Sequence, residues 1–236
     1  LNKKNFKYTH SGEEASHIAF NKKLTKDKIK NLEILTPNFL SIDIDQINEQ
    51  LIIEFFLKEG PIIIKPISSG SSFGIKIFYN ISEIKIFFQN LITNLEIYKN
   101  HKNLLIEKYI NGRELTVSVL QKKNTSHSIN VTEILSNNKF FDYESKYTPG
   151  FSKHVIPADI PSEIYKTCMN HAKLIHDKIN CKGVSRSDFL FHKNKIYFLE
   201  INSQPGLTAV SLVPEQLSKK DISFDDLILH LIKSAK

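Results

Sequence analysis

The spacing of apolar residues changes along the 236-residue chain, and each spacing predicts one type of secondary structure. A repeat of three to four residues predicts helices over residues 11–30, 51–57, 82–98 and 162–179. Ser82 is the expected N-cap of the third helix, and Ser223 with Asp226 predicts a capping box at a last helix. Short β-branched or alternating runs predict strands over residues 61–66, 74–79, 104–107, 114–120, 184–191 and 196–201. Helices mixed with strands, including a hairpin over the last two runs, predict an α+β protein.

The hairpin predicted between residues 184 and 201 carries the clearest chemical signal. Side chains alternate along a strand, so Arg186 and Asp188 share one face, as do Glu200 and Asn202. A turn of three or five residues would set Asp188 opposite Glu200. The same turn would set Arg186 opposite Asn202. Carboxylates with an amide suit a hard cation such as Mg²⁺ that also binds phosphate oxygens; a solvated face with an ordinary salt bridge is the alternative.

The segment from Lys65 to Gly74 predicts a phosphate-binding loop. A lysine ends a buried strand, and the Gly and Ser residues that follow expose backbone N–H groups that can wrap phosphate oxygens. Because the lysine precedes the glycines, this is not a Walker A loop, and an ordinary turn is the alternative. A further phosphate contact could come from lysines of the first helix, which would otherwise form a solvated face: Lys22, Lys23 and Lys26.

Two more segments are candidates for ligand contacts. The connector from Glu107 to Glu114 could bind an adenine edge through its backbone and a nucleobase amine or ribose hydroxyl through a glutamate; a plain hairpin turn is the alternative. Residues 137–153 combine aromatic side chains and charge with little periodicity, which predicts either a loop that closes over a substrate or one pinned by its aromatic residues. Together the segments favour phosphoryl transfer, in which a protein positions groups and neutralises charge.

Composition narrows the class of protein. The chain carries 32 basic and 25 acidic residues, a net charge of +7, with lysines spread along its length, so a compositional bias explains the charge better than nucleic-acid binding. Arg113 and Arg186 are the two arginines, and an arginine kept among so many lysines suggests a site that needs a bidentate fork. Two cysteines and no apolar run near the roughly 20 residues of a membrane span favour a reducing cytoplasm, with no membrane partner.

Taken in chain order, these segments resemble the motifs of the D-alanine–D-alanine ligase family, which belongs to the ATP-grasp superfamily. The similar segments are Tyr8-Thr9-His10-Ser11-Gly12, Ile64-Lys65-Pro66 through Gly74, Glu107 to Glu114, Phe140 to Tyr147, Arg186-Ser187-Asp188, Glu200-Ile201-Asn202, Gln204-Pro205-Gly206-Leu207-Thr208 and Ser211-Leu212-Val213-Pro214. The resemblance implies an ATP-grasp fold in which two α+β subdomains grip ATP. It also implies an acyl phosphate made from one D-alanine and attacked by the amine of a second, for peptidoglycan synthesis.

The resemblance implies a role for each matching residue. ATP would be bound by Lys22, Lys65, Ser71, Ser72, Glu107, Lys108, Ile110, Glu114 and Lys146. Two Mg²⁺ ions, or Mn²⁺ in their place, would be held by Asp188, Glu200 and Asn202. The catalytic groups would be Arg186, Ser71, Tyr147 and the backbone of Gly206. The D-alanine substrates would be bound by Tyr147, Arg186, Gly206, Ser211 and Leu212.

The resemblance also implies a domain division and a homodimer. Residues 1–20 would be the remnant of an N-terminal domain, 21–112 the central subdomain, and 113–236 the C-terminal subdomain with an ω-loop at about 137–153. No segment matches the family's N-terminal glutamate, and Asn21 replaces an aspartate, so we expect most of an N-terminal α/β domain to be missing and the chain alone to turn over poorly. Ligation to D-lactate or D-serine and a non-catalytic nucleotide-binding module are the alternatives.

Overall fold

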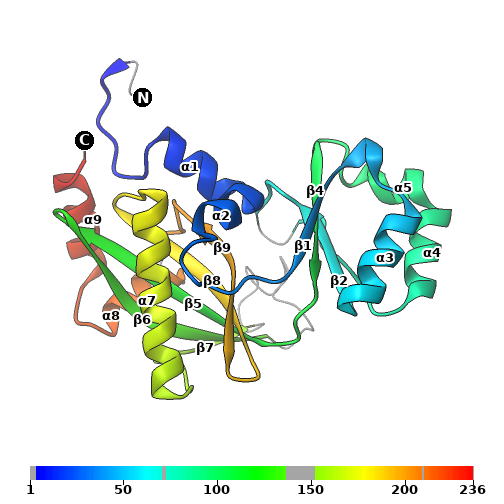
Figure 1. Cartoon of the computed structure of the whole chain (residues 1–236). Coiled ribbons are helices and arrows are strands. Elements are labelled where there is room, and N and C mark those ends of the chain that lie inside the picture. Colours follow the sequence, from blue (N-terminus) through cyan, green and yellow to red (C-terminus); the bar gives the residue numbers. More distant parts are fainter. Residues whose placement is uncertain (1–3, 71–72, 137–151, 209, 236) are drawn as a thin grey trace.

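The chain folds into two antiparallel sheets with helices packed against them, as seen in a computed structural model (Figure 1). The structure describes residues 4–70, 73–136, 152–208 and 210–235. The first sheet has four strands in the order β1-β4-β2-β3, and the second has five in the order β7-β6-β5-β8-β9. The prediction of an α+β protein is confirmed.

The four-stranded sheet has helices packed against it on the outer side of the molecule (Figure 1). Its strands are β1 (Phe39–Asp43), β2 (Ile62–Pro66), β3 (Lys76–Phe78) and β4 (Asn103–Lys108). Its helices are the 3₁₀ turn η2 (Ile44–Gln46), α3 (Glu49–Glu59), α4 (Ile81–Gln89) and α5 (Leu91–Glu96). Their core is formed by Ile52 of α3 and Ile84 of α4 against Ile62, Ile64 and Ile106 of the strands.

The five-stranded sheet is covered on both faces. Its strands are β5 (Arg113–Lys122), β6 (Thr125–Ser136), β7 (Ser152–Val155), β8 (Val184–His192) and β9 (Lys195–Asn202). The surrounding helices are α1 (Glu13–Phe20), α2 (Lys22–Ile29), α7 (Ser162–Ile179), α8 (Leu212–Ser218) and α9 (Phe224–Lys233). Val117 and Val119 of β5 face α7, whereas Leu120 faces α8 and α9, as the alternation of a strand requires.

Helices α1 and α2 pack with the second sheet, although a separate central subdomain was expected to begin at residue 21. Ala15, Ala19 and Ile29 belong to the same core cluster as β5 and α7. The packing therefore groups the first two helices with the five-stranded sheet, and the division at residues 20 and 112 stays a prediction. Figure 1 shows the same arrangement, with α1 and α2 beside β9.

Most of the predicted elements are present, with differences at their ends. The helix over residues 162–179 and the capping box at Ser223 are confirmed. The prediction that Ser82 caps the helix that begins there is wrong: Asn80 accepts a hydrogen bond from the backbone N–H of Glu83, so α4 begins one residue after Asn80. That helix is also shorter than expected, because Asn90 separates α4 from α5.

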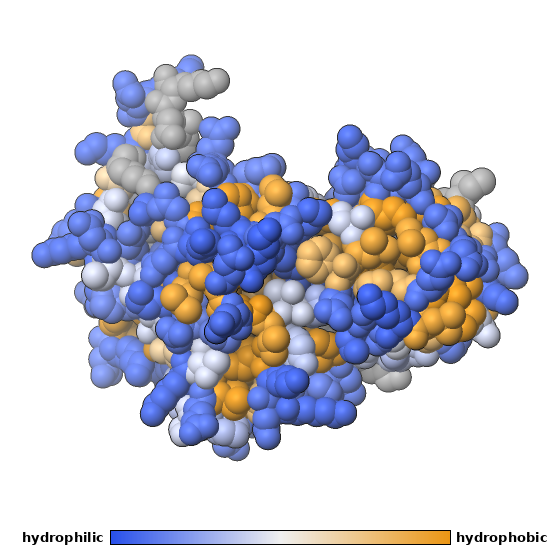
Figure 2. Space-filling view, viewed as in Figure 1, coloured by the Kyte–Doolittle hydropathy of each residue, from blue (hydrophilic) through white to orange (hydrophobic). Residues whose placement is uncertain are grey.

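Hydrophobic residues reach the surface in both halves of the molecule. In the space-filling view, hydrophobic residues gather on the lobe that contains α3 and α4 (Figure 2). Leu57 of α3 and Ile86 of α4 are exposed there. None of the helices in the described ranges is both long enough and apolar enough to span a bilayer.

A buried histidine makes the stability of this fold depend on pH. His176 of α7 is 1% exposed, its Nδ1 lies 2.7 Å from Ser185 Oγ, and burial lowers its pKa to about 4. The unfolded chain therefore binds a proton more readily than the folded chain between pH 6.5 and 4, and stability falls as the pH falls through that window. We expect this histidine to account for a loss of about 3 kcal/mol in the free energy of unfolding.

Urea unfolding at a series of pH values tests this. His176→Gln should lose less stability than the wild type between pH 7 and 4, whereas His127→Gln, at an exposed position, should follow the wild type. Parallel pH profiles for the wild type and His176→Gln would contradict the assignment.

Candidate functional site

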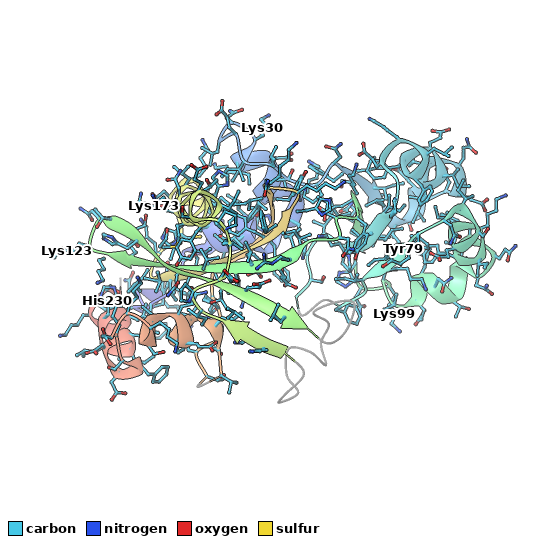
Figure 3. All side chains as sticks on the ribbon, turned by 90° about the horizontal axis from the view of Figure 1, so that it is seen from below. Lys30, Tyr79, Lys99, Lys123, Lys173 and His230 are labelled. Atoms are coloured by element: carbon cyan, nitrogen blue, oxygen red, sulfur yellow. The ribbon has the colours of Figure 1, made fainter. Side chains whose placement is uncertain are left out.

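A cavity of about 370 Å³ lies between the two sheets and is lined by residues from both. Eight of the predicted ATP-binding and metal-binding residues line it: Lys22, Lys65, Glu107, Lys108, Ile110, Glu114, Asp188 and Glu200. Strand β5 begins at this cavity and runs away from the four-stranded sheet to a turn at Lys123, whereas Tyr79 and Lys99 mark the other lobe (Figure 3). The cavity therefore lies where the two sheets meet.

The phosphate-binding lysine predicted at the end of β2 is present, but it already has an anionic partner. Lys65 Nζ pairs with Glu107 Oε2 on the neighbouring strand β4, and Lys26 Nζ lies 2.8 Å from the other oxygen of that carboxylate. All three side chains are more than nine-tenths buried. Burial alone would raise the pKa of Glu107, but the two ammonium groups outweigh it and hold the pKa below its ordinary value.

Lys22 connects the loop that was predicted to bind phosphate to the second sheet. Its Nζ donates a hydrogen bond to the carbonyl of Ser69 at 2.8 Å and lies 3.1 Å from Glu200 Oε2. Its backbone N–H donates to the carbonyl of Ile67, at the start of the same loop. An ammonium group held between a loop carbonyl and a carboxylate is positioned to meet an anion that enters the cavity. Ser71 and Ser72, predicted to contact phosphate, lie outside the described residues.

The cross-strand pairing predicted for the β8–β9 hairpin is confirmed, but its cause is different. Asp188 lies opposite Glu200, and Arg186 lies opposite Asn202. The turn holds only two residues, Lys193 and Asn194, both with positive φ, rather than the three or five that were expected. The register shifts between Asp188 and Phe189, because Leu199 is an extra residue on β9. This bulge brings the two carboxylates into opposition.

Asp188 is held by two neighbours. Thr116 Oγ1 on β5 donates to Asp188 Oδ1 at 2.6 Å, and Arg186 binds both carboxylate oxygens, at 2.9 and 2.8 Å. Burial works against the charge of Arg186, but the Asp188 carboxylate outweighs it and raises the pKa of the guanidinium above its ordinary value. Asp188 is therefore presented to the cavity as an oriented carboxylate.

Both arginines form the bidentate forks that the composition predicted. Arg186 grips Asp188, and Arg113 places Nε and Nη2 each 2.6 Å from an oxygen of Glu133. Arg113 and Glu133 line the cavity next to Glu114, so this second fork belongs to the wall of the same site.

The connector between Glu107 and Glu114 is not the hairpin turn that was one of its interpretations. Strand β4 belongs to the first sheet and β5 to the second, so residues 109–112 cross from one sheet to the other. Lys108 donates its backbone N–H to the carbonyl of Asn38. A Cβ on Gly112 would lie 2.9 Å from the carbonyl of Phe191, so this crossing has no room for a side chain. The connector forms one wall of the cavity.

Of the predicted substrate-binding residues, Gly206, Ser211 and Leu212 lie after the hairpin, and Arg186 lies on it. None of these four lines the cavity, and neither does Asn202. Asn202 ends β9 and accepts a hydrogen bond from the backbone N–H of Gln204 at 2.9 Å. Ser211 Oγ accepts from the backbone N–H of Thr208, and a Cβ on Gly206 would lie 2.8 Å from that oxygen. Leu212 begins α8. Lys146 and Tyr147 lie outside the described residues.

Whether the site suits a divalent cation depends on its donors. The described residues contain no group of three or more His, Cys, Asp or Glu side chains arranged for a metal. The predicted set has two carboxylates, which lie opposite each other, and one amide. These are the hard oxygen donors that Mg²⁺ prefers, so their chemistry fits it.

Sequence reasoning gave no role to Gln216, a fully buried residue of α8. Its Oε1 accepts the backbone N–H of Ser118 at 2.9 Å, and its Nε2 donates to the carbonyl of Thr116 and to Thr132 Oγ1. The β5–β6 register shifts beside this point, between Val117 and Val119. Gln216 therefore supplies amide partners at an irregular place in the sheet and attaches α8 to the strand that orients Asp188.

Comparisons with known proteins identify the family. A family model described as "D-ala D-ala ligase C-terminus" matches residues 29–233. The chain belongs to the D-alanine–D-alanine ligase family. A relative from Pelagibacter ubique (strain HTCC1062), named D-alanine--D-alanine ligase, is 39% identical over 238 residues, covering 100% of this chain and 74% of the relative.

Solved structures of D-alanine–D-alanine ligases have the same fold. The ligase from Bacillus anthracis superposes with a TM-score of 0.80 at 26% identity, covering 99% of this chain and 73% of its own. The same ligase complexed with ATP gives a TM-score of 0.79 at 23% identity, covering 99% and 72%. The expected ATP-grasp fold is confirmed by these neighbours.

The buried amide of Gln216 is a testable part of this site. Gln216→Leu removes three hydrogen bonds and leaves buried backbone groups without these partners, so we expect the free energy of unfolding to fall by about 2–4 kcal/mol. Gln89→Leu, at an exposed position of α4, is the control and should change stability by less than about 0.5 kcal/mol. Urea unfolding measures both, and equal stability of the two variants would show that the amide has no structural role.

Proposed function

We propose that this chain binds ATP in the cavity between the sheets and uses it to join two D-alanine molecules for peptidoglycan precursor synthesis. One observation carries the proposal: two lysines, Lys22 and Lys65, and two carboxylates, Asp188 and Glu200, line one cavity in a chain of this ligase family. Cations suit the phosphates of ATP, while the carboxylates suit the metal ions that accompany them.

The chain's own residues supply positioning and charge. The ammonium groups of Lys22 and Lys65 would bind phosphate oxygens and neutralise negative charge as the γ-phosphoryl group moves to the carboxylate of the first D-alanine, releasing ADP. The amine of the second D-alanine then attacks the acyl carbon and gives up a proton; the C–N bond forms, the bond between the acyl carbon and the phosphate oxygen breaks, and inorganic phosphate leaves. Arg186 and the backbone N–H of Gly206 would stabilise the oxyanion that forms before phosphate leaves.

Metal binding is part of the proposal. Mg²⁺, when bound, would neutralise phosphate charge, and Asp188, Glu200 and Asn202 are the residues that would hold it. In the structure Asp188 is paired with Arg186 and Glu200 with Lys22. Both carboxylates are therefore held in place by cationic side chains of the protein, which limits their motion before any ligand binds.

The ATP site can be tested by removing one cation or one carboxylate. Lys65→Ala and Glu200→Ala should each weaken ATP binding in the presence of Mg²⁺ by at least about tenfold, because each loses a charge at the phosphates or at the metal. Isothermal titration calorimetry measures this. Lys99→Ala breaks an exposed ion pair with Glu96 and should leave the affinity unchanged. Unchanged affinity in both site variants would refute the proposed site.

The acceptor can be identified by phosphate release. With D-alanine as the first substrate, we expect D-alanine to support faster release than D-serine or D-lactate, as the name of the relative from Pelagibacter ubique indicates. Faster release with D-serine or D-lactate would assign the chain to that alternative. Because the chain alone is expected to turn over poorly, slow release that is fastest with D-alanine still supports the ligase, whereas ATP binding with no detectable release for any acceptor would favour a nucleotide-binding module.

Two further proposals follow from the resemblance to the family. We propose that the chain forms a homodimer and acts in the cytoplasm on small molecules alone, without nucleic acid. Sedimentation equilibrium measures the oligomeric state, and a mass equal to one chain at micromolar concentration would contradict the homodimer.

A further inference from the structure

One lysine beside the cavity has no role in the proposed reaction. The side chain of Lys26 is 1% exposed, and the residue does not line the cavity. Its ammonium group lies 2.8 Å from Glu107 Oε1 and above the ring of Phe39, at 5.6 Å from the ring centroid. It is too deeply buried to reach a ligand in the cavity. Its partner Glu107 also pairs with Lys65, which does line the cavity.

These three side chains form a row that we name the Lys26–Glu107–Lys65 chain. Burial lowers the pKa of Lys26, and the Glu107 carboxylate opposes that shift. With all three groups ionised, two positive charges and one negative charge leave the row with one net positive charge. Without Lys26, the pair of Glu107 and Lys65 would be neutral. A neutral pair would attract an anion weakly, and its carboxylate would repel a phosphate group that approached Lys65.

The position of Lys26 on α2 shows that its burial is specific. Lys22 and Lys26 are four residues apart and point from the same side of the helix toward Glu200 and Glu107. Lys28 on the same helix is exposed, and Lys23 forms a surface pair with Asp27. Burying an ammonium group is unfavourable unless it is paired, and Glu107 provides that pair.

We propose that Lys26 is a positioning residue for the phosphates of ATP, because it neutralises the Glu107 carboxylate on the side away from the cavity and leaves Lys65 with an effective positive charge. The inference rests on the proposed ATP site and adds how the charge of that site is set. It differs from a purely structural role in one respect. Loss of the Lys26 charge should weaken the binding of a polyphosphate, but not the binding of the uncharged nucleoside.

The test compares ATP with adenosine by isothermal titration calorimetry on the whole chain. Lys26→Met keeps an unbranched side chain only one atom shorter and removes the charge, so ATP affinity should fall by about tenfold while adenosine affinity stays within about twofold. Lys28→Met is the matched control on the same helix and should bind both ligands as the wild type does. An unchanged ATP affinity in Lys26→Met, or an equal loss for ATP and adenosine, would overturn the proposal.

A second variant tests the charge directly. In Lys26→Met/Glu107→Gln the net charge is again plus one, on Lys65 alone, so the ratio of ATP affinity to adenosine affinity should return to within about threefold of the wild-type ratio, whatever Glu107 contributes to the nucleoside. A ratio as low as in Lys26→Met would overturn the proposal. Lys26→Arg keeps the charge and should stay within about threefold of the wild type, which provides the test if Lys26→Met does not fold; a tenfold loss in folded Lys26→Arg would contradict the proposal.

The wild type separates this inference from the proposed function. If the wild type binds adenosine as tightly as ATP, the phosphate site itself is wrong. If it prefers ATP, and Lys26→Met keeps the whole of that preference, only the role of Lys26 is wrong.

Discussion

Helix α2 joins the two sheets through two lysines on one of its sides, and the site depends on that junction. The helix packs through Ile29 into the core of the five-stranded sheet. Its Lys22 pairs with Glu200 of β9 in the same sheet. One turn later Lys26 crosses to Glu107 on the four-stranded sheet. Buried ion pairs of this kind add little net stability, because desolvation offsets most of the attraction. Their effect is to fix which charged groups face each other across the cavity.

The site also depends on two positions at which the regular pairing of neighbouring strands is interrupted. The extra residue Leu199 changes the register of β9, so that Glu200 lies opposite Asp188. A second irregularity, beside Ser118 on β5, is filled by the side chain of Gln216. With regular pairing from the same turn, Leu199 rather than Glu200 would lie opposite Asp188, and Glu200 would face the other side of the sheet. The chemistry of the hairpin therefore depends on two local departures from an ideal sheet, both next to the candidate site.

Local signals in the sequence predicted many of the elements, but not β1, β6, β7 or α8, nor the break at Asn21 between α1 and α2. The apolar stripe of α7, the β-branched run of β2 and the capping box at Ser223 depend on residues close in the chain, and all three are confirmed. The contacts that were missed join residues far apart. Gln216 and Ser118 are 98 positions apart, and no periodicity relates them.

The sequence also could not show that β4 and β5 belong to different sheets, because a Gly-containing connector between two strands has the same pattern in a hairpin and in a crossover. Nor could the sequence show that the Glu107 carboxylate lies between two lysines, and the assignment of Glu107 to the nucleobase or ribose stays a prediction. Residue types identified the charged groups of the site, but only the packing of α2 showed how they are paired.

A crystal structure of the chain with a non-hydrolysable ATP analogue would test the account most directly. The account predicts phosphate oxygens within hydrogen-bond distance of the ammonium groups of Lys22 and Lys65, with Lys26 still on Glu107 behind them. An analogue bound outside the space between the sheets, or phosphates held by Lys26 itself, would contradict it.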